Sequence, residues 1–154
     1  MRSHQITLKQ LAPRDAPAVY ALVQANRDHL TQLGDYKDYV ALSEAQLADQ
    51  LGSDAETTFG IFAPGLIGTV SLIHHTETAF GLGYWIESVS AGKGITTSAV
   101  RLAIKKAEDL GAKELWAGIS HNNAASIRVV EKLGFKLARE QETHLSYQLV
   151  LEQS

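Results

Sequence analysis

The chain has 154 residues, of which 45% are hydrophobic and 20% are charged, a balance typical of a globular protein with one buried core. The formal net charge of −3 argues against nucleic acid as a partner, and the lack of cysteine excludes disulfides, thiolate metal ligands and a cysteine nucleophile. No apolar run approaches the roughly 18 residues of a membrane span, and the N-terminus lacks a signal-peptide core, so we expect one cytoplasmic domain over residues 1–154.

Helical signals dominate the first third of the sequence. Residues 5–12 predict a first strand, and Pro13 marks the start of a helix with a regular apolar stripe. A short helix is predicted over residues 26–34, where a glycine ends it, and another over residues 43–52 with Ser43 as its N-cap.

Strand signals follow between residues 57 and 87. Two strands are predicted around the turn at Pro64 and Gly65. Residues 80–87 predict a third, in which Leu82, Tyr84 and Ile86 alternate with the residues between and after them. Because the connections are short, we expect these strands to be antiparallel neighbours.

Helices and strands alternate in the last third. Beyond Gly94 the apolar period changes from two to 3.6, which predicts a helix, and residues 113–120 return to strand alternation. Residues 122–134 predict another helix, and two strands end the chain. The resulting order, β-α-α-β-β-β-α-β-α-β-β, predicts a mixed α/β domain.

A glycine-rich loop from Gly92 to Gly94 runs directly into one of these helices. A helix start exposes unpaired backbone N–H groups, and glycines let a pyrophosphate approach them. A Walker loop would need glycine where Glu87 stands, and a dinucleotide fingerprint would need glycine where Thr97 stands, so the sequence fits neither. On spacing alone, a tight turn without a ligand remains an equal alternative.

Two segments of the chain resemble one family. "GLGYWIESVSAGKGITTSAV" followed by "SHNNAASIRVVEKLGFK" is similar to the GNAT superfamily of acyl-CoA-dependent N-acyltransferases, and more narrowly to its RimJ/RimL branch, whose named members acetylate N-terminal amines of ribosomal proteins. The early "NRDHL" also matches this branch, so the resemblance covers nearly the whole chain. It implies a mixed, mostly antiparallel sheet of about seven strands, splayed into a V and flanked by about four helices.

The resemblance also implies where acetyl-CoA binds. It places the cosubstrate between the strand ending at residues 85–87 and the strand 113–120, with the pyrophosphate on backbone amides of the loop. Asn123 would hydrogen-bond the pantetheine arm, although it could equally be only a helix N-cap. Val89 departs from the glutamine or arginine common at its position, which puts affinity in doubt. The implied cosubstrate-binding residues are Trp85, Ile86, Ala91, Gly92, Lys93, Gly94, Ile95, Thr96, Thr97, Asn123 and Ser126.

Two residues are the catalytic candidates. Glu87 is the first candidate for the general base, with a solvated loop carboxylate as the alternative, and Glu140 and Glu142 are weaker candidates. Many members of the superfamily protonate the leaving thiolate with a tyrosine where this chain has Val130. The resemblance to the RimJ/RimL branch implies that a serine at the Ser126 position replaces this tyrosine as the proton donor. The alternative is a serine that only lies on the helix surface.

The acceptor is expected to be an amine. At pH 7 an α-amine of pKa 7.7 to 8.0 is roughly 10 to 15% neutral, against about one part in 2500 for a lysine-like amine, so an α-amine of a protein N-terminus or peptide-like molecule needs less help. We expect direct transfer in a ternary complex, no metal, no nucleic acid, no membrane, and a monomer or homodimer. The alternatives are acetylation of a small-molecule amine, such as an antibiotic or an amino-acid-like toxin, and a non-catalytic CoA-binding sensor.

Overall fold

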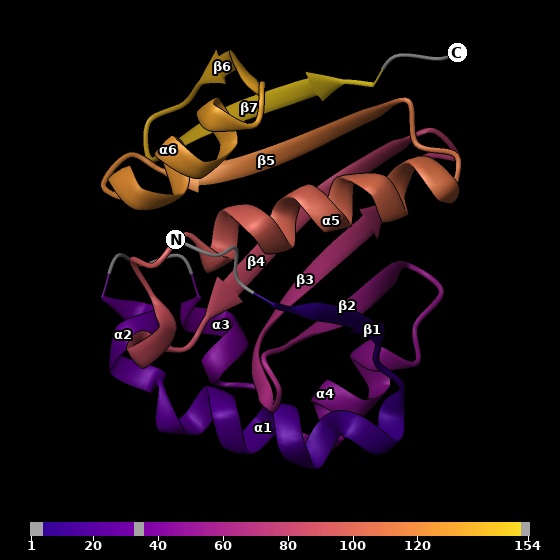
Figure 1. Ribbon diagram of the computed structural model, residues 1–154, viewed down its shortest axis with the longest axis vertical. Coiled ribbons are helices and arrows are strands. Elements are labelled where there is room, and N and C mark those ends of the chain that lie inside the picture. The colour runs from indigo at the N-terminus through magenta and orange to yellow at the C-terminus, as the bar shows by residue number, and fades with distance from the viewer. Residues whose placement is uncertain (1–4, 33–35, 152–154) are drawn as a thin grey trace.

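One seven-stranded sheet organises the chain (Figure 1). The computed structural model describes residues 5–32 and 36–151, and the strand order is β1-β2-β3-β4-β5-β7-β6. Every neighbouring pair is antiparallel except β4 and β5, which confirms the predicted mixed, mostly antiparallel sheet. The strands are β1 (Thr7–Gln10), β2 (Glu56–Phe62), β3 (Leu66–His74), β4 (Ala79–Ile86), β5 (Glu114–Ser120), β6 (Lys136–Glu140) and β7 (His144–Val150).

The described residues form six α-helices, more than the four or so expected. The excess comes from the region before β2, where Asn26 leaves the helical conformation and separates two helices. The single turn over residues 37–40 has too few residues to show a period, and Gly34, the predicted end of a helix, lies outside the described residues. No described helix has the length and apolarity to cross a bilayer. The helices are α1 (Ala16–Ala25), α2 (Arg27–Thr31), α3 (Lys37–Val40), α4 (Glu44–Leu51), α5 (Ile95–Asp109) and α6 (Ala124–Lys132).

The sheet splits between its two parallel strands. β4 and β5 pair only at their starts, where residues 79–81 lie beside residues 114–116. The remaining parts of both strands diverge toward their C-terminal ends, beside α2 and α6 (Figure 1). This divergence is the V predicted from the resemblance, and it leaves the ends of β4 and β5 unpaired with each other.

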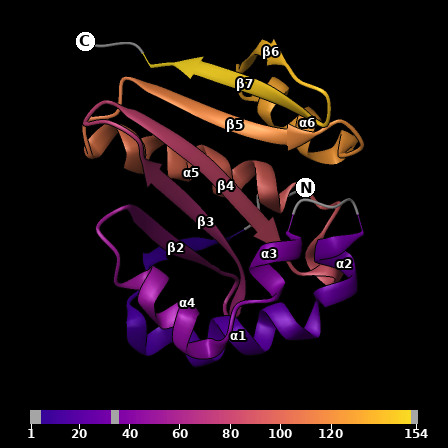
Figure 2. The same cartoon turned by 180° about the vertical axis from the view of Figure 1, so that it is seen from behind.

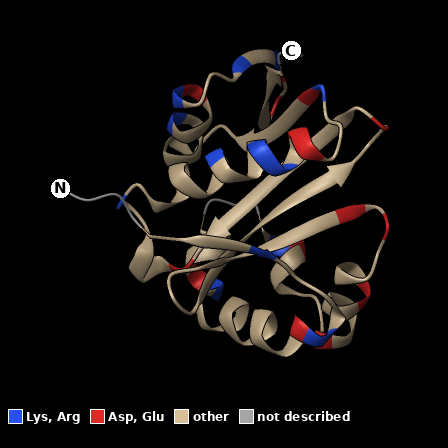
Figure 3. Ribbon diagram, turned by 45° about the vertical axis from the view of Figure 1, so that its right-hand side comes forward, with Lys and Arg blue, Asp and Glu red and all other residues tan. Residues whose placement is uncertain are grey.

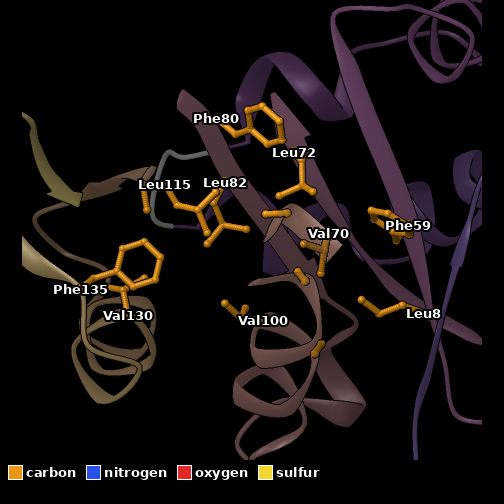
Figure 4. Close-up of a cluster of buried hydrophobic side chains, with 14 of the residues drawn as sticks. Leu8, Phe59, Val70, Leu72, Phe80, Leu82, Val100, Leu115, Val130 and Phe135 are labelled. Atoms are coloured by element: carbon orange, nitrogen blue, oxygen red, sulfur yellow. The ribbon is translucent and has the colours of Figure 1, made fainter. Parts of the chain in front are cut away.

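The helices cover opposite faces of the sheet. α5 and α6 lie on the face toward the viewer in Figure 1, and Figure 2 shows α3 and α4 in front of the sheet from the other side. On the first face, Val100 of α5 points toward Val70 and Leu82, while Val130 of α6 lies near Phe135 (Figure 4). A second cluster joins α1, α3 and α4 to Trp85 of β4. Because β4 is packed on both faces, its end is held rigidly.

Charged residues are absent from two central strands of the sheet. β3 and β4 contain no Lys, Arg, Asp or Glu, whereas α5 carries both signs of charge (Figure 3). An unpaired charge in a strand that is buried on both faces would lose its hydration, so such strands are apolar.

Ser43 caps α4 as the sequence predicts. Its hydroxyl accepts a hydrogen bond from the Gln46 backbone N–H at 3.1 Å, and the Gln46 side-chain oxygen accepts from the Ser43 N–H at 2.8 Å. This reciprocal pair satisfies two N–H groups that the helix leaves without an internal partner.

We expect Ser43→Ala to destabilise the protein by about 1 kcal/mol, because one capping bond is lost. Thermal unfolding should show a decrease in Tm of roughly 2 to 4 °C. Ser43→Asp is the matched control, because aspartate caps as well as serine and should preserve the wild-type Tm. Equal losses in the two variants would contradict a capping role.

Candidate active site

Two adjoining cavities open where the sheet splits, and the larger of these two is described first. It has a volume of about 420 Å³ and lies between the end of β4, the loop before α5, the start of α6 and part of α2. Its lining residues are His29, Leu30, Gln32, Tyr36, Tyr84, Trp85, Ile86, Ala91, Gly92, Gly94, Thr96, Thr97, Asn123, Ala125, Ser126, Arg128 and Val129.

The glycine-rich loop has the backbone that its sequence requires. Gly92 and Gly94 have φ values of 77° and 79°, a left-handed conformation that residues with a Cβ rarely adopt. Gly94 is the N-cap of α5, so the exposed N–H groups at the start of this helix lie beside the cavity. The segment before the loop is anchored through Ser88, whose N–H donates to the Asn26 side chain at 2.9 Å.

The start of α6 forms another wall. The Asn123 side-chain oxygen accepts a hydrogen bond from the Ser126 backbone N–H at 3.1 Å, so Asn123 does cap this helix, the alternative considered from the sequence. It also lines the cavity. The cap fixes the first turn of α6 and thereby the position of the Ser126 side chain.

Tyr84 joins β4 to α6 through its hydroxyl. The phenol oxygen lies 2.6 Å from Ser126 Oγ, and the phenol also donates to the Ser126 carbonyl at 3.2 Å. At the other end, the Tyr84 carbonyl accepts a hydrogen bond from the Tyr36 hydroxyl. The two hydroxyls of Tyr84 and Ser126 thus form one connected pair at the point where the strands part.

A smaller cavity of about 220 Å³ lies between the diverging ends of β4 and β5. It shares Tyr36, Tyr84, Asn123 and Ser126 with the larger cavity, and its other lining residues are Leu82, Gly83, Ala117, Gly118, Ile119 and His144. The two cavities therefore meet at the Tyr84–Ser126 hydroxyl pair. Two molecules bound in them would meet at that point.

The charge around the cavities favours an anionic ligand. Among residues 5–32 and 36–151, no Asp or Glu lines either cavity, whereas Arg128 lines the larger one. Lys93 adds a positive charge on the exposed loop. Within the same residues, no three His, Asp or Glu side chains are grouped so that they could hold a metal ion.

Most of the predicted binding residues lie together, but three predicted residues do not line the larger cavity. Lys93 is exposed on the loop, and Ile95 packs against the hydrophobic core. Glu87 lies just beyond β4, and its carboxylate accepts a hydrogen bond from the Ser90 hydroxyl at 2.6 Å. Trp85, Ile86 and all the other predicted residues do line the larger cavity.

Trp85 has a structural role in addition. Its side chain is only 5% exposed and belongs to the helical cluster, with its ring 6.2 Å from that of Tyr39. Burial raises the pKa of the Tyr39 phenol, which therefore stays neutral in this apolar contact. The indole N–H is buried and has no acceptor within the described part of the chain.

The sequence did not identify Tyr84, Tyr36 or His144 as site residues. Tyr84 shares the strand period of Leu82 and Ile86, so its pattern is that of a packed strand residue. Tyr36 lies in a region of short helices and His144 begins the last strand. Both are distant in sequence from the predicted site, and only the tertiary structure places them beside it. One sequence feature could have identified Tyr84 as a site residue: it stands in "GYWI", inside a segment that carries the family resemblance.

Comparison with known proteins identifies relatives along nearly the whole chain. The family model for the acetyltransferase (GNAT) domain matches residues 5–136. The probable N-acetyltransferase YjcK of Bacillus subtilis strain 168 is 34% identical over 150 residues, which cover 88% of this chain and 82% of YjcK.

Solved structures share the fold at lower identity. RimL, a ribosomal L7/L12 α-N-protein acetyltransferase in complex with coenzyme A, has a TM-score of 0.80 and 20% identity, covering 97% of this chain and 96% of RimL. The aminoglycoside acetyltransferase AAC(6')-Ib in complex with coenzyme A has a TM-score of 0.78 and 18% identity, covering 95% of each chain. At these identities the likeness concerns the fold.

Proposed function

Because the chain belongs to the GNAT family and is an acetyl-CoA-dependent N-acetyltransferase, we propose that it acetylates the α-amine of a protein N-terminus or peptide-like molecule, in the manner of the RimJ/RimL branch. The observation that carries this proposal is the meeting of two cavities at Tyr84 and Ser126. The larger cavity suits the cosubstrate, although it is lined by the end of β4 and by no residue of β5, between which the resemblance places acetyl-CoA. The smaller cavity, which does lie between β4 and β5, would take the amine beside the thioester, so both substrates can be present together. Direct transfer in a ternary complex follows, and the chain has no cysteine to carry the acetyl group.

The larger cavity offers what coenzyme A needs. Its pyrophosphate would lie on the backbone N–H groups around Gly92, Gly94 and Thr96, where the helix dipole favours negative charge. The pantetheine arm would pass along the end of β4, on the side where β4 no longer pairs with β5, toward Ser126. The exposed charge of Lys93 adds long-range attraction without lining the cavity.

The Tyr84–Ser126 hydroxyl pair would serve the leaving group. When the C–S bond breaks, the sulfur takes the electron pair and becomes a thiolate, which can accept a proton from Ser126 while Tyr84 supplies one to the serine. The 2.6 Å distance between the two oxygens suits such a relay. Since a thiol has a pKa near 8.5, the thiolate is already a tolerable leaving group, and this proton should help without being indispensable.

The general base is a separate requirement. Glu87 is the candidate from the sequence, and its carboxylate is bonded to Ser90 and does not line either cavity. For Glu87 to act, water must carry the proton from the amine. An α-amine eases this demand because an appreciable fraction is neutral at pH 7.

A small-molecule amine is the second candidate acceptor. The smaller cavity, at about 220 Å³, holds only a slim group, and a compact amine would fit it as well as a peptide terminus does. The shared fold with an aminoglycoside acetyltransferase is compatible with a small-molecule amine as acceptor.

The acceptor class is tested by thiol release from acetyl-CoA with a panel of amines. We expect thiol release with a free α-amine peptide to be roughly 250 to 400 times faster than with the same peptide carrying a blocked N-terminus and a free lysine, in line with their neutral fractions at pH 7. Faster turnover of compact amines than of any peptide would favour the small-molecule alternative. Tight acetyl-CoA binding with no turnover on any amine would favour a non-catalytic CoA-binding sensor.

A further inference from the structure

His144 is exposed to solvent and lines the smaller cavity because of how the last strand pairs. β7 is antiparallel to β5, and the register places His144 opposite Ser120, at the end of β5 that diverges from β4. The first residue of β7 is thereby brought to the split in the sheet. There it lines the smaller cavity together with Tyr84, Asn123 and Ser126.

His144 is also the lone imidazole or carboxylate among the described residues that line this cavity. Glu140 and Glu142, which precede it in the hairpin, are exposed and line neither cavity. His29 lines the larger cavity, on the side assigned to the cosubstrate. Among the described residues, His144 is therefore the one that can act as a base in direct contact with an amine in the smaller cavity.

Thr143 can set the protonation pattern of this ring. The Nδ1 atom of His144 lies 2.7 Å from Thr143 Oγ1. When Nδ1–H donates to that oxygen, the lone pair of the neutral ring lies on Nε2, which is then the atom able to accept a proton. Thr143 would act as a positioning residue for this tautomer.

We propose that His144 is the general base that deprotonates the acceptor amine, an inference that rests on the proposed function. The ammonium group passes one proton to Nε2, and the neutral nitrogen forms a bond to the thioester carbonyl carbon. The C–S bond then breaks and its electron pair goes to sulfur. The thiolate takes a proton from the Tyr84–Ser126 pair, which recovers one from the nitrogen as the amide forms. His144 returns its proton to solvent, so one proton is released per turnover.

The pH dependence must be interpreted with the neighbouring groups in mind. The phenols of Tyr36 and Tyr84 line the same cavity, and Glu142 lies two positions before His144 in the hairpin. His121 is attached to the hairpin, since its backbone N–H donates to the Thr143 carbonyl at 3.2 Å and its ring Nε2 lies 2.7 Å from the Gln141 carbonyl oxygen. His121 lines neither cavity, which makes it the matched control.

The test compares His144→Gln with His121→Gln, using whichever amine the wild-type protein acetylates. We expect His144→Gln to lower kcat/KM for the amine by about a hundredfold at pH 7, the lower end of what a general base contributes. The deficit should shrink to about ten- to twentyfold at pH 9, where an α-amine is more than about 90% neutral without help. His121→Gln should stay within about twofold of wild type, and the Kd for acetyl-CoA should be unchanged in both variants.

Four outcomes would overturn this assignment. A loss in His144→Gln that is constant with pH would indicate a structural role only. A pH-dependent loss in His29→Gln or Glu87→Gln, with His144→Gln close to wild type, would move the base to that residue. No wild-type turnover on any amine would overturn both this inference and the proposed function, whereas wild-type turnover that survives His144→Gln would overturn this inference alone.

Discussion

Removing both hydroxyls of the Tyr84–Ser126 pair, as Tyr84→Phe with Ser126→Ala, is expected to lower kcat by about a hundredfold, the lower end of the range for acid–base groups. The two oxygens lie 2.6 Å apart where the cavities meet, and the thiolate that forms there loses its proton source. The KM for acetyl-CoA should change by less than about twofold, because in the proposed mechanism both hydroxyls act on the leaving sulfur in the transition state, whereas the pyrophosphate is held by the glycine-rich loop. Steady-state thiol release under saturating acetyl-CoA measures both constants.

The single variants show whether the hydroxyls act as a unit. We expect Ser126→Ala to slow turnover by about tenfold without abolishing it, and the double variant to lose less than the product of the two single losses. Tyr20→Phe removes a phenol hydroxyl from α1, away from both cavities, and controls for the change itself. Unchanged kcat in Ser126→Ala and Tyr84→Phe would remove the pair from the mechanism.

The parts of this site that the sequence revealed are local in the chain. The glycine-rich loop and the helix it starts are adjacent, so spacing alone placed Gly92, Gly94 and Thr96 together, and the structure has them on one cavity. Ser126 was found through the resemblance of its segment to a family. Ser43 as a helix cap followed from a serine at the start of a helical segment.

The parts that the sequence missed depend on strand register. Tyr84 meets Ser126 across a separation of 42 residues, and His144 reaches the cavity through its pairing with Ser120. The alternation of a strand shows which residues share a face, but not which partner lies beside them. Glu87 stays a prediction: it stands at the expected end of the strand, but its carboxylate accepts a hydrogen bond from Ser90 and does not line either cavity.

The glycine-rich loop gives the second large expected effect. Gly94→Val should raise the Kd for acetyl-CoA by at least about tenfold, which corresponds to about 1.4 kcal/mol. At a φ of 79°, a residue with a Cβ costs roughly 1 to 2 kcal/mol, and a β-branched one fits worse still, so the loop must leave the conformation that presents its N–H groups. Calorimetric titration of the purified protein with acetyl-CoA measures this loss.

Two comparison variants assign the effect to the backbone. Gly65→Ala lies in the β2–β3 turn, where an added Cβ meets nothing within 4 Å and φ is not positive, so acetyl-CoA binding should be unchanged. Gly94→Asn should bind better than Gly94→Val, because asparagine tolerates the left-handed conformation. If Asn and Val weaken binding equally, the added Cβ itself blocks the pyrophosphate. If neither weakens it, the diphosphate is not held by this loop, and the assignment of the larger cavity to coenzyme A loses its anchor.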